Sequence, residues 1–261
     1  MFARFEALSA NVSTTASIID RFEPISLAEM DGVKLQDRVD TKYVFGEDRL
    51  PEVFTAMLPD YRLLEVDGTR GTQYRSLYFD TADLKQYKDH HNKRTFRSKV
   101  RFREYIGSDL VFLEVKRKTG RGRTDKKRIR VDGIRDELTS EQQAFVMKSS
   151  GLSQPVQATL WNYFTRYTFV NKNAPERLTM DVGLRYSDVS GERELGGIVI
   201  AELKQERADR TSPFVRIMRS RVMQASGMSK YCVGMLLMQR NVKHNAFKAV
   251  LLKLQQLRKA A

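Results

Sequence analysis

Basic residues occupy every second position of one short segment of this chain. The segment is Phe96-Arg97-Ser98-Lys99-Val100-Arg101-Phe102-Arg103. Successive side chains of a β-strand point to opposite faces of the sheet. We therefore expect a strand with four cations in a row on one face and an apolar opposite face. Such alternation usually means a solvated outer face, but like charges side by side on a sheet repel one another, and a row of four cations is reasonable where it lines a concave site that holds a polyanion.

The same alternation continues in the segments that follow. Residues 111–118 place Glu114, Lys116 and Lys118 on one face and apolar residues on the other, and Arg128 and Arg130 then alternate with apolar neighbours. Residues 93–130 hold 15 Lys and Arg against 4 Asp and Glu, which accounts for 11 of the formal net charge of +14. A charge of this size predicts attraction to polyanions, among them nucleic acid, anionic lipid, nucleotides and phosphate chains.

Charged and apolar faces also alternate in three other segments, 38–45, 177–182 and 198–204. Six such strands predict an α+β fold built on a closed antiparallel β-barrel with a polar, basic interior. Helices expected at 48–57, 139–149, 213–224 and 241–259 would cover its apolar exterior. The alternative is an ordinary open sheet whose charged face is solvated.

The rest of the sequence predicts one domain over residues 21–261, with weak order in residues 1–20. Cys232 is the single cysteine, which excludes an internal disulfide and a zinc site built from several cysteines. The longest apolar stretch, 233–238, is too short to span a bilayer. A reducing, cytoplasmic compartment fits these features.

Carboxylates among the cations point to a metal. Glu202, Asp181 and Glu114 each fall on a predicted charged face. Mg²⁺ and Mn²⁺ prefer hard oxygen ligands, and phosphate oxygens and water can complete their coordination. The alternative is that these carboxylates are plain ion-pair partners of neighbouring lysines and arginines.

Several blocks together resemble a known family. They are Arg38–Tyr43, Tyr74–Thr81, Lys99–Tyr105, Phe112–Lys116, Leu178–Asp181, Ala201–Lys204 and Ser229–Tyr231. In this order they are similar to the VTC domain, the catalytic domain of the vacuolar transporter chaperone polyphosphate polymerases. That family belongs to the triphosphate tunnel metalloenzymes, whose antiparallel barrel encloses a basic tunnel.

The resemblance implies roles for individual residues. Catalytic tunnel cations would be Lys42, Arg101, Arg103, Lys116 and Lys230. Substrate-binding cations would be Arg97, Lys99, Lys118, Lys127, Arg166, Arg177, Arg185 and Lys204. Glu202 matches the family's metal-binding glutamate, with Asp181 and Glu114 as further candidates for Mn²⁺ or Mg²⁺. Asp40 stands where tunnel enzymes often have glutamate, which argues against a metal ligand there.

The implied reaction transfers the γ-phosphoryl group of ATP to the end of a polyphosphate chain. If the product is translocated, that step would need a membrane-protein partner. A tunnel hydrolase acting on inorganic or organic triphosphates is the first alternative. A nucleic-acid-binding protein is the second, but it predicts exposed aromatic side chains among the cations, whereas Phe96 and Phe102 fall on the apolar face.

Overall fold

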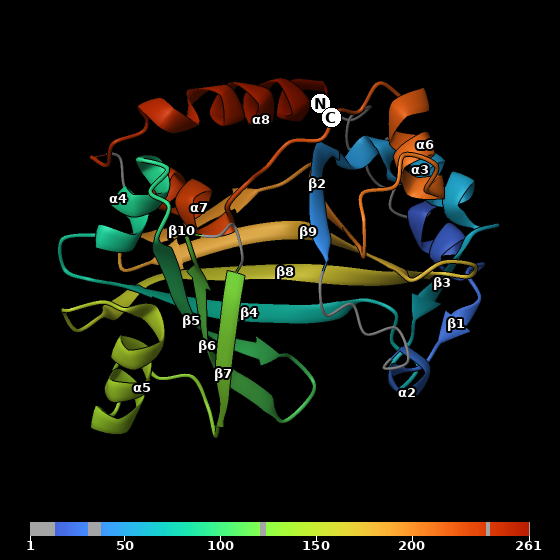
Figure 1. Cartoon of the computed structure of the whole chain (residues 1–261). Coiled ribbons are helices and arrows are strands. Elements are labelled where there is room, and N and C mark those ends of the chain that lie inside the picture. Colours follow the sequence, from blue (N-terminus) through green and yellow to red (C-terminus); the bar gives the residue numbers. More distant parts are fainter. Residues whose placement is uncertain (1–13, 31–37, 121–123, 239–240, 261) are drawn as a thin grey trace.

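The computed structural model describes residues 14–30, 38–120, 124–238 and 241–260. It is an α+β fold around a sheet of 11 strands, in which all paired strands are antiparallel except β1 with β3 (Figure 1). The strands are β1 (Pro24–Ile25), β2 (Val39–Gly46), β3 (Tyr61–Leu64), β4 (Thr72–Asp80), β5 (Arg97–Tyr105), β6 (Leu110–Lys118), β7 (Thr124–Val131), β8 (Gln157–Asn171), β9 (Glu176–Asp188), β10 (Gly191–Leu195) and β11 (Ile198–Gln205). The helices are α2 (Leu27–Met30), α3 (Leu50–Met57), α4 (Lys85–His91), α5 (Ser140–Ser150), α6 (Pro213–Ser220), α7 (Lys230–Met238) and α8 (Lys248–Ala260).

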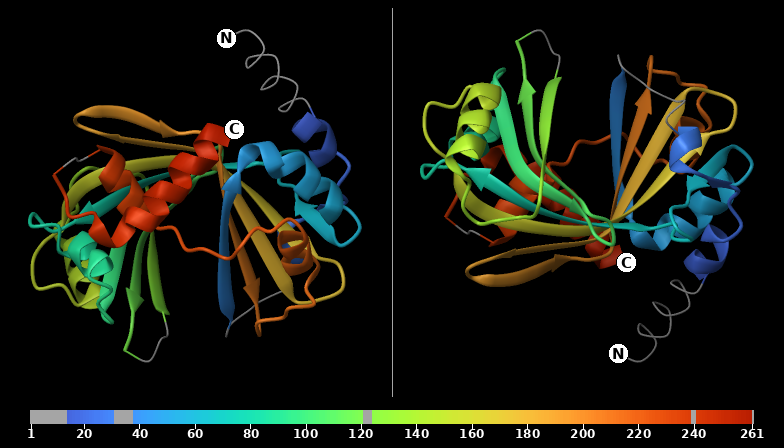
Figure 2. Two further views of the ribbon diagram at one scale, coloured as in Figure 1. Left: turned by 90° about the horizontal axis from the view of Figure 1, so that it is seen from above. Right: turned by 90° about the horizontal axis from the view of Figure 1, so that it is seen from below.

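The sheet curves strongly but does not close. Its main path runs β2-β11-β9-β8-β4-β5-β6-β7, and within the described residues the two end strands are not paired with each other (Figure 2). The prediction of a closed barrel is therefore wrong. The outer edge of β2 is already engaged, because Ser226 N donates to Lys42 O at 2.8 Å and Tyr43 bridges to Ala225. Pairing β2 with β7 would also set Lys42 beside the cations of β7.

The predicted alternation of faces is confirmed in β5 and β6. Val100 and Phe102 are fully buried on the convex side of the sheet, in a cluster that α5 completes. Arg101 pairs in register with Glu114, and Lys99 with Lys116, so the charged residues of both strands share the opposite, concave face. Burial of the apolar face thus forces the cations to the inside of the curve.

Helices cover the convex face in two patches. The helices α3 and α6 pack on β2, β9 and β11, where Phe54 and Phe214 are fully buried. The helix α5 packs on β5 and β6 and begins with a capping box formed by Thr139 and Gln142. The predicted helix at 213–224 ends early, at Ser220, because Val222 adopts a left-handed conformation with a φ of 58°.

The concave face carries the expected cations over one part, but it is apolar over the rest. The helices α4, α7 and α8 pack against the sheet there, with Tyr231, Cys232, Val233 and Met235 of α7 buried against Leu160 and Ile200 of the strands (Figure 1). The C-terminal helix packs on the sheet through Leu254, but on the concave side and not on the exterior that we expected, and it begins at Lys248.

Two further features concern the ends of the chain and membranes. Weak order is predicted for residues 1–20, yet residues 14–19 are helical and place Ile18 and Ile19 in the core; residues 1–13 lie outside the described residues.

Among the helices described, none combines the length and the apolar character needed to cross a membrane.

The packing of α7 on the sheet can be tested at Gly234. A Cβ at this position would lie 2.5 Å from side-chain atoms of Leu160 and Tyr186. Although alanine normally stabilises a helix relative to glycine, we expect Gly234→Ala to lower the free energy of unfolding by about 1–3 kcal/mol because it overpacks this contact. The control is Gly227→Ala, whose Cβ meets nothing within 4 Å. Stabilisation of the Gly234 variant in urea unfolding would contradict this packing.

Candidate functional site

A continuous set of cations lines the concave face outside the apolar part; we call it the basic face. Its members are Lys42 of β2, Lys99, Arg101 and Arg103 of β5, Lys116 of β6, Lys126 of β7, Arg166 of β8, Arg177 of β9, Lys204 of β11 and Lys230 of α7. The two arms of the sheet face each other across this space, since the charges of Glu202 and Lys42 act on the pKa of Lys116.

Glu114 is the carboxylate of the β5–β6 arm and is 2% exposed. Arg101 donates to its Oε2 from Nε at 2.9 Å and from Nη2 at 2.7 Å, and Lys126 Nζ lies 2.5 Å from its Oε1. Burial opposes ionisation of Glu114, but these cations outweigh it and hold the pKa of its carboxyl well below the ordinary value. Both oxygens of Glu114 are therefore ion-paired with protein cations, although Oε1 makes no well-directed hydrogen bond among the described residues.

Asp181 holds the corresponding position in the β8–β9 arm and is 3% exposed. Arg166 binds it in bidentate fashion, with Nε at 2.6 Å and Nη2 at 2.8 Å, and Lys230 donates to the same carboxylate. Despite burial, Arg166 and Lys230 hold the pKa of Asp181 well below its ordinary value. Lys230 Nζ also lies 4.4 Å from the ring centroid of Phe164.

Glu202 differs from the other two carboxylates. Its side chain is 20% exposed, and its ion pairs are long, with Lys204 Nζ at 3.4 Å and Lys42 Nζ at 3.9 Å. Burial opposes ionisation, but the neighbouring lysines, Lys204 first, keep the pKa of Glu202 well below its ordinary value. An ionised, loosely paired carboxylate suits a hard divalent cation.

The described residues do not build a metal cage. No three His, Cys, Asp or Glu side chains among them are placed to hold one ion. A metal at Glu202 fits this chain when most of its ligands are phosphate oxygens and water, as is usual for Mg²⁺. Asp181 and Glu114 do not fit, because Arg166, Lys230, Arg101 and Lys126 already occupy their oxygens.

Positive charge on the basic face exceeds what the three carboxylates neutralise. Burial lowers the pKa of Lys99 and of Lys204 to about 8 each. Burial and the neighbouring Arg101 lower the pKa of Arg103 to about 10. Lys99 Nζ has the hydroxyl of Ser229 as its hydrogen-bond acceptor, at 3.0 Å. Burial therefore disfavours the charged forms of Lys99, Lys204 and Arg103, and a bound polyanion would stabilise them.

Unsatisfied polar atoms lie on the same face. Arg103 Nε, Ser76 Oγ and Thr179 Oγ1 are buried and have no hydrogen-bond partner in the parts of the chain that the structure describes. Ser76 is the register partner of Arg103, and Thr179 is that of Glu202. Buried polar groups normally have partners, so these three atoms mark places for ligand or water.

The structure places Lys127 outside the basic face. Lys127 is opposite Val115 on the convex side and lies 4.0 Å from Asp125, whereas Lys126 is opposite Lys116 on the concave side. Lys126 stands two residues before Arg128, so it shares a face of the strand with Arg128 and Arg130. This spacing was the signal that could have identified Lys126 instead of Lys127. Arg97 and Lys118 are register partners in β5 and β6. They lie beyond the partners Lys99 and Lys116, at the end of the basic face.

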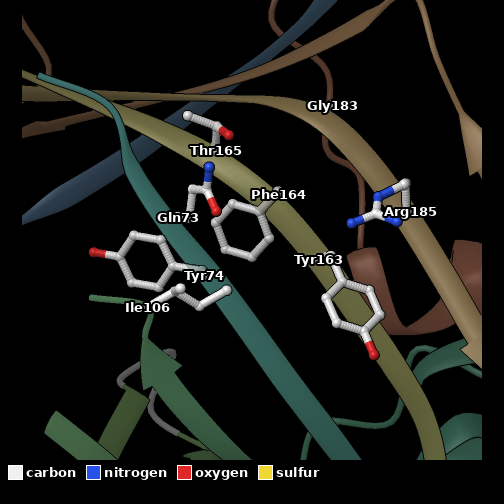
Figure 3. A pocket seen from close by; sticks show the side chains of 8 residues that line it. All are labelled: Gln73, Tyr74, Ile106, Tyr163, Phe164, Thr165, Gly183 and Arg185. Carbon is white, nitrogen blue, oxygen red and sulfur yellow. The ribbon is translucent and has the colours of Figure 1, made fainter. Parts of the chain in front are cut away.

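Arg185 is also absent from the basic face, because β9 contains a bulge. Its pairing with β8 shifts by one residue between Tyr163 and Thr165, next to Gly183, whose φ is 60°. One extra residue reverses the face of every residue that follows. Arg185 therefore lies over the Tyr163 ring, with Nη1 3.1 Å from Glu192 Oε1. It lines a small pocket with Gln73 and Gly183 whose wall also includes Phe164, a ring that Arg166 of the basic face contacts (Figure 3).

Comparison with known proteins gives one family and several solved structures. A family model described as "VTC domain" matches residues 37–239. No curated protein matches. A putative adenylyl cyclase, HpAC1, from Hippeastrum, described as having a dominant triphosphatase activity, is 14% identical, with 76% of this chain and 95% of that chain covered and a TM-score of 0.47. The PH1819 protein of Pyrococcus horikoshii is 10% identical, with 76% and 98% covered and a TM-score of 0.39.

The unfavourable burial of Lys99 predicts a pH-dependent stability effect. The folded-state pKa of about 8 lies below the ordinary 10.5, so the cost of the charge is fully present below pH 8 and fades as the pH rises towards 10.5. We expect Lys99→Met to raise the free energy of unfolding by about 1–3 kcal/mol at pH 7 and by much less at pH 10.

Denaturant unfolding at the two pH values measures this difference. Lys127→Met, on the convex side, is the matched control and should change stability by less than about 0.5 kcal/mol at either pH. Destabilisation by Lys99→Met at pH 7 would contradict the unfavourable charge.

Proposed function

The chain belongs to the VTC domain family, and from this premise we propose that it transfers the γ-phosphoryl group of ATP to the end of a polyphosphate chain. The observation that carries the proposal is the excess of buried cations on the basic face. Triphosphates and polyphosphate carry closely spaced charges and many acceptor oxygens, which suit closely spaced arginines and lysines. The buried donor of Arg103 would find its acceptor in such a ligand.

The cations divide into two kinds in this proposal. Arg101 and Arg166 are held by Glu114 and Asp181, which fixes the direction of their guanidinium groups before a ligand binds. Lys99, Lys204 and Arg103 are less well compensated and supply the attraction for charge that develops on the transferred phosphoryl group. Catalysis of this kind depends on positioning and electrostatics.

The proposed step needs no covalent enzyme intermediate. A terminal oxygen of the polyphosphate chain attacks the γ-phosphorus of ATP, the bond from that phosphorus to the β–γ bridging oxygen breaks, and ADP leaves. Glu202 would hold the divalent metal, Mn²⁺ or Mg²⁺, which when bound supplies charge neutralisation across the phosphates. Lys42 and Lys204 flank Glu202 and would contact the same phosphates.

Incubation of the purified protein with ATP and Mn²⁺ tests this function. We expect long, acid-labile phosphate polymer on a gel. Glu202→Gln and Arg101→Ala should each reduce its rate of formation by about 10²–10³-fold, because each removes a preorganised charge from the transferred group. Arg185→Ala is the matched control, since this arginine lies outside the basic face, and it should leave the rate unchanged.

Other outcomes separate the alternatives. Release of free phosphate without polymer would replace the polymerase proposal with triphosphate hydrolysis at the same face. Absence of turnover, together with salt-sensitive binding of RNA or DNA, would overturn both enzymatic proposals.

A further inference from the structure

Three consecutive residues at the start of α7 each contact a different strand. Ser229 caps the helix by accepting from Cys232 N at 3.2 Å and receives Lys99 Nζ of β5 at 3.0 Å. Lys230 donates to Asp181 of β9. The Tyr231 hydroxyl donates to Asp80 Oδ2 at the end of β4. Two of these contacts involve cations of the basic face, whereas the third lies behind that face.

Asp80 is completely buried and bound by hydrogen bonds alone in the described structure. Its Oδ1 accepts from the backbone of Thr81 and Gln86, each at 2.8 Å, and its Oδ2 accepts from Tyr87 N at 2.9 Å as well as from Tyr231. Leu84, before α4, has a left-handed conformation and gives no side-chain cap. One carboxylate therefore joins the first turn of α4 to the first turn of α7.

The remaining contacts of α7 are mainly apolar. Its residues from Tyr231 to Met235 pack in the concave apolar cluster, and the Tyr231 ring lies 5.1 Å from that of Tyr78. Close packing at Gly234 sets how near α7 lies to the sheet, whereas the hydrogen bond from Tyr231 to a buried carboxylate is directional and also sets the rotation of the helix about its axis. The Tyr231–Asp80 bond is thus suited to fixing where α7 begins.

We propose that Tyr231 and Asp80 are positioning residues that hold Lys230 against Asp181 on the basic face. The inference deepens the proposed function and rests on it for its effect on ligand binding. Lysine has a long, flexible side chain whose ordering is costly, so the placement of its Cα decides how well its ammonium is aimed. Tyr231 is adjacent in the chain to Lys230, and Tyr78 links this region to Arg101, which donates to the Tyr78 hydroxyl at 3.2 Å.

Titration with inorganic triphosphate tests the effect on binding. We expect Tyr231→Phe to weaken binding about five- to tenfold, as the loss of a hydrogen bond to a buried carboxylate implies. Tyr87→Phe is the matched control: Tyr87 packs in the same cluster, but its hydroxyl donates to Lys243 O at 2.5 Å, so binding should change less than twofold. In a Lys230→Met background Tyr231→Phe should have no further effect, and an equal loss in both backgrounds would overturn the proposal.

A ligand-free measurement keeps the proposal testable if triphosphate does not bind. The coupling between Lys230 and Asp181 is obtained from the unfolding of Lys230→Met, Asp181→Asn and the double variant, in the parent protein and in Tyr231→Phe. We expect coupling of about tenfold or more in the unfolding constant of the parent, falling below about threefold in Tyr231→Phe. Unchanged coupling would overturn the positioning role, whereas failure of the parent to bind triphosphate would count against the proposed function alone.

Discussion

Repulsion among cations that the sheet forces together is the constraint on which this structure depends. In β5 the apolar residues Val100 and Phe102 are fully buried under α5, so the residues between them must face the inside of the curve. Glu114 and Asp181 neutralise their nearest arginines, so they do not compensate the other cations of the face. What remains is a face on which burial holds the pKa of Lys99 and of Lys204 below the ordinary value, which is the electrostatic condition for binding a polyanion.

The apolar part of the concave side gives this face a boundary. The helix α7 and the strands bury Tyr186, Tyr231 and Met235 there, and the basic face begins where α7 begins. The N-terminal end of a helix carries partial positive charge, so the start of α7 adds to the field of Lys230 and Lys99. Residues 229–231 thus anchor the start of a buried helix and also place a cation, Lys230, on the basic face.

Much of this arrangement follows from short-range pattern. Alternation is a local property of a strand, and it predicted the shared face of Arg101, Arg103 and Lys116 and the apolar faces beneath the helices. The family resemblance added Arg185 to the same cations, but the bulge at Gly183 changes the phase of β9 and turns Arg185 outward. In β7 the phase set by Arg128 and Arg130 favours Lys126 over Lys127.

Whether the sheet closes, and where α7 packs on it, depend on long-range contacts that alternation does not encode. The outer edge of β2 pairs with residues 225 and 226, which are far along the chain. Residues 230–238 are apolar on nearly all sides, which is typical of a buried helix and was the available signal for α7. The partner of Tyr231, Asp80, lies 151 residues away and had no signal in the pattern.

Proton uptake on binding tests the central claim most directly. A polyanion that stabilises charged lysines must raise their pKa, so binding of inorganic triphosphate at pH 8.5 should draw protons from the buffer. Calorimetric titration in two buffers with different ionisation enthalpies measures the number taken up. We expect net proton uptake that decreases in Lys99→Met and is unchanged in Lys127→Met. Tight binding without proton uptake, or no binding, would contradict it.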